Sequence, residues 1–130
     1  MNYSGYLVDK DNNKYYTGIV ESGQNENGNY IKFADGTMIC TLNIKVTDQA
    51  ISTQYGNANI YFGTRDWIFP VIFKNTPIVA CDCFRWSTGG SWGSAGPSSI
   101  KQVRLFGYDL FSRPSGENCY IQAIAIGKWK

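Results

Sequence analysis

Apolar and polar residues alternate with a period of two through most of this chain. The clearest example is YIKFADGTMICTLNIKV, residues 30–46. Its second half places apolar side chains on one face of an extended chain: Met38, Cys40, Leu42, Ile44 and Val46. This alternation predicts a strand with one buried face. The Asp35-Gly36 pair before it is typical of a two-residue hairpin turn, because both central positions favour positive φ.

Later segments have the same strand character: ANIYF, WIFPVIF, PIVACDCFRW, IKQVRLFGYDLF and CYIQAIAIGKW. Short stretches rich in Gly, Pro, Ser and Asn separate them. No segment shows helical periodicity over a useful length. Many short strands separated by turns predict an all-β protein that folds as an antiparallel β-sandwich.

The last predicted strand is unusual because both of its faces are apolar. Tyr120, Ile124 and Ile126 lie on one face, whereas the other carries Ile121, Ala123 and Ala125. An antiparallel strand normally leaves one face to water. We therefore expect the second face to be buried against another subunit of a homo-oligomer. A central strand inside a single sandwich is the alternative.

The first 26 residues differ in character from the rest of the chain. YLVDKDNNKYYT predicts a small hairpin with a polar tip, and ESGQNENGN has the composition of a loop or hinge. We therefore predict an N-terminal β arm with its linker at residues 1–26, followed by a β-sandwich domain at residues 27–130.

Two segments are candidates for ligand recognition. RWSTGGSWGSAGPSS, residues 85–99, has a composition that predicts a Gly- and Ser-rich loop with Trp92 at its tip. TQYGNAN, residues 53–59, predicts a second loop with Tyr55 and Asn57. Loops held on a rigid β scaffold are the usual place for recognition residues. Trp92 either contacts a ligand or folds back and packs against the sandwich, and the sequence favours neither reading.

The residue types of these loops suit a carbohydrate. A flat aromatic ring packs on the apolar C–H face of a sugar, and charged or amide groups form strong hydrogen bonds with its hydroxyls. We therefore predict that Trp92 contacts the receptor, with Tyr55, Asn57 and Arg85 as its neighbours in the binding site.

Composition and charge narrow the function classes. Aromatic residues make up 15% of the chain and charged residues 17%, and the net charge of +2 includes no basic run. Nucleic-acid binding therefore has no electrostatic basis. The longest apolar run, WIFPVIF, is too short to span a bilayer, so membrane insertion is not expected. The N-terminus lacks the features of a secretory signal, and we expect synthesis in the cytoplasm.

The four cysteines, Cys40, Cys81, Cys83 and Cys119, predict buried free thiols. Zinc sites usually use wider Cys spacings or His ligands, and the chain has no His. DKDNN resembles the start of a calcium-binding EF-hand loop, but Lys14 stands where that loop needs Gly and Val20 where it needs Glu. We predict neither a metal nor a cofactor.

Catalytic chemistry is not favoured either. Without His, the Ser-His and Cys-His nucleophile systems are excluded. The carboxylates are scattered, and no spacing indicates the pair that a glycosidase needs. We predict a binding protein that is not an enzyme, and a glycan depolymerase is the less favoured alternative.

Several motifs resemble those of one protein family. NGNYIKFADGTMIC is similar to the opening of C-terminal domains in bacteriophage and prophage tail fibres. FPVIFKNTPIVACDCF, the ending AIAIGKWK and the early segment GYLVDKDNNKYY also resemble segments of these proteins. The resemblance implies a receptor-binding tip domain of a tail fibre, attached to the rest of the fibre and acting outside the cell. The rival interpretation is a structural module that only trimerises and caps the fibre.

The second half of the chain also resembles the H-type lectin fold. The shared pattern comprises Phe69, Phe73, Pro77 and Val79, then VRLFGYD, then Cys119-Tyr120. This resemblance implies a six-stranded antiparallel β-sandwich that forms a homotrimer with sugar sites near the subunit interfaces. The Trp-His pair and the Asp that help those lectins to hold sugar have no counterparts here. A glycan site would therefore use other residues, and the segment with Trp92 is the candidate.

Overall fold

The computed structural model describes residues 6–8, 10–16, 18–84 and 90–130. The strands are β1 (Tyr6–Val8), β2 (Lys14–Tyr16), β3 (Ile19–Asn25), β4 (Gly28–Phe33), β5 (Thr37–Val46), β6 (Thr53–Gln54), β7 (Tyr61–Ile68), β8 (Ile78–Phe84), β9 (Ser91–Ser98), β10 (Gln102–Asp109) and β11 (Cys119–Lys128). The described residues include no helix that is long and apolar enough to cross a membrane.

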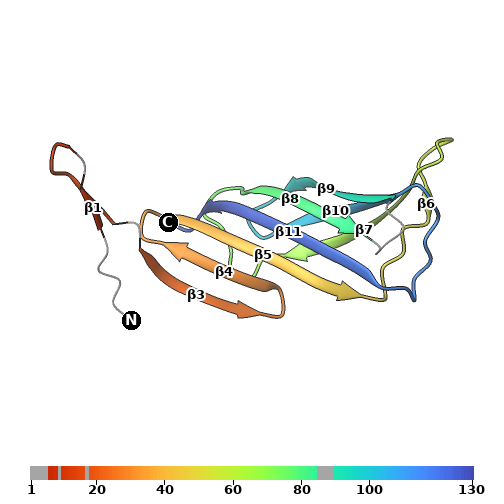
Figure 1. Cartoon of the computed structure of the whole chain (residues 1–130), viewed down its shortest axis with the longest axis horizontal. Helices are drawn as coiled ribbons and strands as arrows, with labels where there is room; N and C mark the ends of the chain where they lie inside the picture. Colours follow the sequence, from red (N-terminus) through yellow and green to blue (C-terminus); the bar gives the residue numbers. More distant parts are fainter. Residues whose placement is uncertain (1–5, 9, 17, 85–89) are drawn as a thin grey trace.

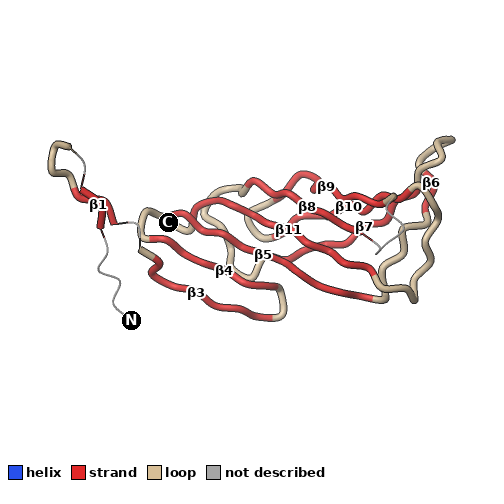
Figure 2. The backbone as a smooth tube through the Cα atoms, viewed as in Figure 1, coloured by secondary structure: helices blue, strands red, loops and turns tan. Residues whose placement is uncertain are grey.

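Two antiparallel sheets form a β-sandwich, as the sequence predicts (Figure 1). One sheet has the five-strand order β3-β4-β5-β11-β8, and the other has the four-strand order β6-β7-β10-β9. Over the described residues the sandwich therefore has more strands than the six that the lectin resemblance implies. The connections β5–β6, β6–β7 and β10–β11 gather at the end of the sandwich farther from the C-terminus (Figure 2).

The core lies between the two sheets, and the apolar residues of the alternating pattern point into it. Strand β5 contributes Met38, Cys40 and Leu42, all of which are buried. The long loop after β7 adds Phe69 and Phe73, whose rings meet edge to face with centroids 5.1 Å apart. Burial of these large side chains supplies most of the driving force for folding. The prediction of a half-buried strand at residues 38–46 is confirmed.

The turn between β4 and β5 is one residue longer than the sequence suggests. Residues 34–36 form the connection, and the Gly36 N–H donates to the Phe33 carbonyl oxygen at 3.0 Å. Within this fully described turn only Gly36 has positive φ, at 97°. The Asp35 carboxylate accepts a hydrogen bond from the Thr37 N–H at 2.8 Å, so Asp35 acts through its side chain. This is the usual form of a three-residue hairpin that ends in glycine.

For the first 29 residues, the structure confirms one part of the predicted secondary structure and contradicts another. Strands β1 and β2 form the predicted small hairpin as a separate two-stranded sheet. The loop or hinge predicted at residues 21–29 is wrong, because β3 pairs with β4 along the edge of the five-stranded sheet. The Asn27 carbonyl oxygen accepts a hydrogen bond from Trp67 Nε1 at 2.7 Å, which ties this hairpin to β7. The division into an arm with its linker at residues 1–26 and a β-sandwich domain at residues 27–130 stays a prediction.

The predicted Gly-Ser loop at residues 87–99 is wrong over its described part, residues 90–99, because Ser91–Ser98 form strand β9, whereas residues 87–89 lie outside the described residues. A side chain at Gly93 would place its Cβ only 2.7 Å from the backbone nitrogen of Cys83 in β8. Glycine therefore allows β9 of one sheet to approach β8 of the other closely. Ala95, two residues on, packs against the core. The small size of Gly93 and Ala95 therefore reflects the close packing of β9 on β8 and the core.

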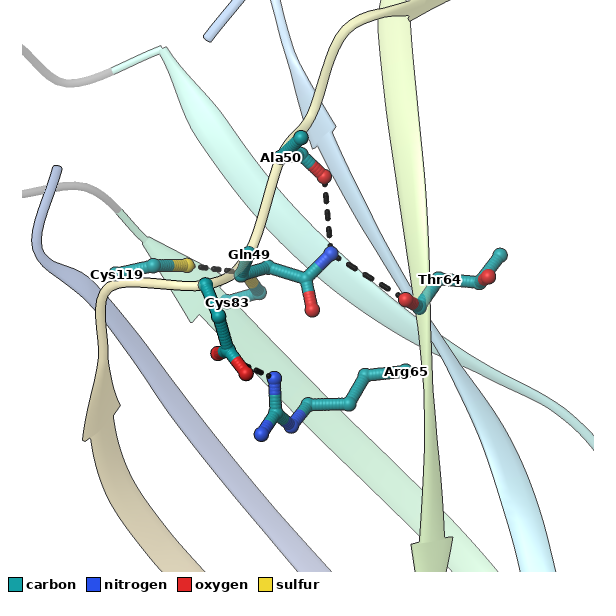
Figure 3. A network of polar contacts seen from close by, with 7 residues as sticks. Gln49, Ala50, Thr64, Arg65, Cys83 and Cys119 are labelled. Carbon is teal, nitrogen blue, oxygen red and sulfur yellow. Dashed lines mark hydrogen bonds and ion pairs between the residues drawn. The ribbon is translucent and has the colours of Figure 1, made fainter. Parts of the chain in front are cut away.

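Polar contacts fasten the connection after β5 to the four-stranded sheet (Figure 3). The buried Gln49 side chain donates to the carbonyl oxygens of Ala50 and Thr64, at 2.9 and 3.3 Å. Arg65 forms an ion pair with Asp48 at 3.0 Å. These contacts hold residues 48–50 against β7, which fixes one end of the sandwich.

Candidate functional site

The outer face of the four-stranded sheet carries the candidate site. Along β10, Val103, Leu105, Gly107 and Asp109 are buried and point into the sandwich. The intervening residues lie on the outer face: Gln102, Arg104, Phe106 and Tyr108. Successive side chains of a strand point to opposite faces, so the same alternation that builds the core builds this surface.

An aromatic row crosses this face: Tyr55, Phe62, Tyr108 and Trp92. Tyr55 follows β6 and meets Phe62 of β7 edge to face, with ring centroids 5.8 Å apart. Phe62 is paired with Tyr108 of β10, and Tyr108 is paired with Trp92 of β9. The rings of Trp92 and Tyr108 are stacked, with centroids 5.6 Å apart and planes 17° apart. Three parts of the chain, residues 55–62, 92 and 108, therefore contribute to one aromatic surface.

Trp92 lies in strand β9 rather than at a loop tip. Its ring packs against the outer face of the sandwich by stacking on Tyr108, while 40% of its surface stays exposed. Contact with a ligand stays a prediction. Tyr55, at the other end of the row, is 59% exposed. Asn57 is exposed in the same turn as Tyr55, where the Ala58 N–H donates to the Tyr55 carbonyl oxygen. Arg85 lies outside the residues that the structure describes.

A groove of about 350 Å³ lies next to the aromatic row. Its lining residues are Asp66, Gly96, Pro97, Ser98, Ser99, Gln102, Val103, Arg104 and Phe106. A Cβ at Gly96 would lie 2.9 Å from the Phe106 ring, so glycine leaves room for that ring. The Phe106 ring is nearly parallel to that of Tyr108, with centroids 6.4 Å apart. The groove and the aromatic row are therefore continuous through Phe106.

A forked ion pair between neighbouring strands lines the groove. Arg104 Nε donates to Asp66 Oδ1 at 2.9 Å, and Arg104 Nη2 donates to Asp66 Oδ2 at 3.4 Å. The hydrogen bond from Arg104 lowers the pKa of Asp66, and the bond to Asp66 raises the pKa of Arg104. Both side chains are substantially exposed, so the pair presents its charges to solvent and contributes little to the stability of the fold.

Sequence reasoning missed most of this surface: Phe62, Asp66, Arg104, Phe106 and Tyr108. The segment QVRLFGYD, which is predicted to be a strand, contains a pattern that indicates this surface. Its alternation places Arg104, Phe106 and Tyr108 on the face opposite the buried Leu105. Two aromatic side chains on an exposed strand face indicate an interaction surface.

The outer face of the five-stranded sheet carries a different feature, an isoleucine face of Ile39, Ile78, Ile124 and Ile126. Ile126 of β11 pairs with Ile39 of β5 on one side and with Ile78 of β8 on the other. In the single chain Ile78 is 81% exposed, Ile124 38% and Ile126 44%. The opposite face of β11 is buried in the core, as the sequence predicts. The isoleucine face contains Ile124 and Ile126 of the last strand, on the side that is predicted to be covered by another subunit.

Metal ligands do not cluster within the described part of the chain. It contains no group of three or more His, Cys, Asp or Glu side chains placed to hold a metal ion. Cys83 and Cys119 approach each other in the core with their sulfurs 3.5 Å apart, and Cys40 is also buried. Cys81 is half-buried. Burial raises the pKa of Cys40 and of Cys81 to about 11, as expected for thiols packed among apolar groups.

Comparison with known proteins gives a structural likeness only. No family model and no curated protein matches the chain. The fold is similar to a C-terminal part of the R1 pyocin fibre from P. aeruginosa, with a TM-score of 0.54 and 15% identity over 83% of this chain. It is also similar to an N-truncated R1-type pyocin tail fibre, with a TM-score of 0.55 and 15% identity over 82% of this chain.

The lengths of the matched proteins differ. This chain spans 28% of the first fibre structure and 84% of the second. At this identity the likeness establishes the shared β-sandwich fold.

Proposed function

We propose that this chain is a receptor-binding domain of a phage or prophage tail fibre, which attaches to a bacterial surface glycan without catalysis. The aromatic row carries the proposal, because it is exposed at both ends on a rigid sheet. The fold likeness to pyocin tail fibres and the motif resemblance to tail-fibre C-terminal domains support the same assignment.

The chemistry of the row suits a sugar. Exposed aromatic rings offer flat apolar surface to the C–H face of a pyranose, and Tyr and Trp add a polar group to each ring. Phe62 pairs with Thr53 of β6, and β6 lies at the end of the sandwich away from the C-terminus (Figure 2). The row therefore begins at that end. A rigid sheet loses little conformational entropy when a ligand binds, which favours affinity.

Trimerisation is the second part of the proposal. The isoleucine face is a contiguous apolar surface, and exposed apolar patches of this kind mark interfaces. We assign it to contacts between three copies of this chain, attached to the rest of the fibre. Three weak sugar sites on one trimer would then act together and raise the overall affinity. The domain would be made in the bacterial cytoplasm and would act outside the cell as part of the virion.

The alternatives are less well supported. A purely structural cap does not need Trp92 and Tyr55 to be exposed. A depolymerase needs a protonated carboxyl group near a carboxylate. Among the described residues that line the groove, only Asp66 carries a carboxyl group, and Arg104 lowers the pKa of that group. Asp66 is therefore poorly suited to act as a general acid. Kinship with the H-type lectins stays a prediction.

A glycan array tests the proposal. The fluorescently labelled wild-type chain is expected to bind defined bacterial glycans, and Trp92→Ala is expected to lose most of that signal. Ile72→Ala is the matched control, because Ile72 is an exposed apolar residue outside the row. Equal binding by wild type and Trp92→Ala would exclude the row as the receptor site, whereas absence of binding by both proteins would favour the structural cap.

A further inference from the structure

The groove beside Phe106 offers groups that the aromatic row lacks. The row provides mainly apolar surface, whereas the groove has a carboxylate and a guanidinium held together by two hydrogen bonds. Hydroxyl and amide side chains line the same groove, from Ser98, Ser99 and Gln102. The Ser98 hydroxyl donates to the Pro77 carbonyl oxygen, and the Ser99 hydroxyl bonds to the backbone of residues 101 and 102, so the fold uses both hydroxyls. The ion pair therefore carries the polar recognition beside Phe106.

The ion pair retains hydrogen-bonding capacity after it forms. A guanidinium has five N–H donors, and a carboxylate has about four lone-pair sites. The pair with Asp66 engages two nitrogens of Arg104 and one lone pair on each carboxylate oxygen. The groups that remain can accept from one hydroxyl and donate to its neighbour. Two adjacent hydroxyls on a sugar ring need this combination, and charge-assisted bonds of this type are the stronger ones.

Charge balance in the groove argues against an anionic ligand. Asp66 and Arg104 compensate each other, and the other residues that line the groove are uncharged. The lowered pKa of Asp66 keeps its carboxylate ionised at neutral pH. An acidic sugar would have to approach this carboxylate without an unpaired cation among the lining residues. A neutral sugar meets no such repulsion.

We propose that this groove is a second sugar subsite, which holds a neutral pyranose with adjacent hydroxyl groups on Asp66 and Arg104 and its C–H face on Phe106. This inference rests on the proposed function, because the aromatic row is the first subsite. The near-parallel rings of Phe106 and Tyr108 join the two subsites along β10. The receptor is then a neutral oligosaccharide segment rather than one terminal sugar.

Nuclear magnetic resonance titration of the isotope-labelled full chain tests this inference. The probes are neutral gluco-, galacto- and manno-oligosaccharides of one to four residues, with oligogalacturonate as the acidic counterpart. With a trisaccharide we expect shifts at the backbone amides of Gly96, Ser99 and Gln102 as well as at Trp92 and Tyr108. We expect affinity to rise by about tenfold or more from the monosaccharide to the trisaccharide, as a second set of contacts requires.

Asp66→Asn tests the role of the ion pair. This variant keeps the shape of the side chain but removes its charge, and we expect it to abolish the gain in affinity with chain length while monosaccharide shifts at Trp92 persist. Asp48→Asn is the matched control, because Asp48 forms a similar ion pair with Arg65 and does not line the groove. It is expected to bind every probe as the wild type does.

The outcomes separate the two proposals. Shifts confined to the aromatic row, with no gain from longer chains, would overturn the second subsite and leave the proposed function standing. Preference for oligogalacturonate would overturn the neutral ligand. Absence of shifts at both regions with every probe would count against the proposed function, and the subsite would fall with it.

Discussion

The Trp92 ring lies nearly parallel to the ring of Tyr108 on the neighbouring strand, with their centroids 5.6 Å apart. Trp92 is held from one side by this contact while 40% of its surface stays exposed. Holding a ring in place lowers the entropic cost of ligand binding, so the stack suits Trp92 to the proposed role in glycan binding. The same contact explains how a large ring can sit among glycines and serines without lying in a loop.

Close packing of β9 against β8 predicts a sharp difference between two glycines. In Gly93→Ala the new Cβ would meet the Cys83 backbone at 2.7 Å, and backbone cannot move aside cheaply. We expect a loss of about 2 kcal/mol in stability, typical of overpacking. In Gly90→Ala the new Cβ would lie 3.5 Å from the Leu110 side chain, which is an ordinary contact. Thermal melting at one protein concentration compares them, and equal melting temperatures would contradict the assignment of β9.

The isoleucine face predicts the assembly state. Ile126→Asp places a charge at a position that is 44% exposed in the single chain, so the fold should tolerate it. Between subunits the same charge would be buried without a partner, which is strongly unfavourable. Light scattering at micromolar concentration should give a trimer for wild type and for the control Ile72→Asp, and a monomer for Ile126→Asp. A monomeric wild type would refute the proposed interface.

The buried thiols predict how stability depends on alkaline pH. Burial raises the pKa of Cys40 and Cys81 from 9.0 to about 11, so the folded state favours their protonated forms. Their contribution to stability is complete below pH 9.0 and is lost as the pH rises towards about 11. The melting temperature should fall over this window, and less steeply in the double variant Cys40→Ala, Cys81→Ala. The same slope in both proteins would exclude these thiols as the cause.

A thiol titration complements that measurement. In denaturant all four cysteines should react with a thiol reagent without prior reduction, whereas in the folded protein at neutral pH the three fully buried ones should be protected. Two missing thiols in denaturant would indicate a disulfide, and Cys83 with Cys119 would be the first pair to examine, because their sulfurs are 3.5 Å apart.

Glycan binding should depend little on pH across the neutral range. The chain has no His, and hydrogen bonding to Arg104 lowers the pKa of Asp66. The Asp66 carboxylate is therefore ionised throughout, and its interactions weaken only as the pH falls through that lowered pKa. Affinity for one glycan should stay constant from about pH 5 to about pH 8, a range in which His is the usual titrating group. A change of more than about tenfold would show that another group controls binding.

The fold could be predicted from the sequence where one face is buried. The alternation at Met38, Cys40 and Leu42 is strong because the core selects it, and those residues are buried as predicted. Strand β9 could not be recognised in the same way, because its inward positions hold Gly93 and Ala95. Their small size is set by the backbone of β8 in the other sheet, and composition alone does not reveal that neighbour.

The candidate site could be predicted only in part for a similar reason. Trp92 and Tyr55 were identified from residue type, but the surface that joins them depends on strand register. Phe62 lies opposite Tyr108, and Asp66 lies opposite Arg104, only because β7 and β10 pair in this register. The two strands are about 40 residues apart in the sequence. Pairing over such a distance is fixed by the whole sheet rather than by any local motif.

Attachment of the labelled protein to bacterial cells, measured by flow cytometry across a panel of strains, tests the central claim most directly. Loss of the stack in Trp92→Ala should cost about 1 kcal/mol in stability, which leaves the protein folded at assay temperature. The variant should also lose about 1 kcal/mol of binding free energy at each sugar site, which corresponds to an attachment reduced by about fivefold. Loss of avidity in the trimer would enlarge this effect. Ile72→Ala should attach as wild type does. Normal attachment by a folded Trp92→Ala protein would contradict the assignment of the aromatic row as the receptor-binding site.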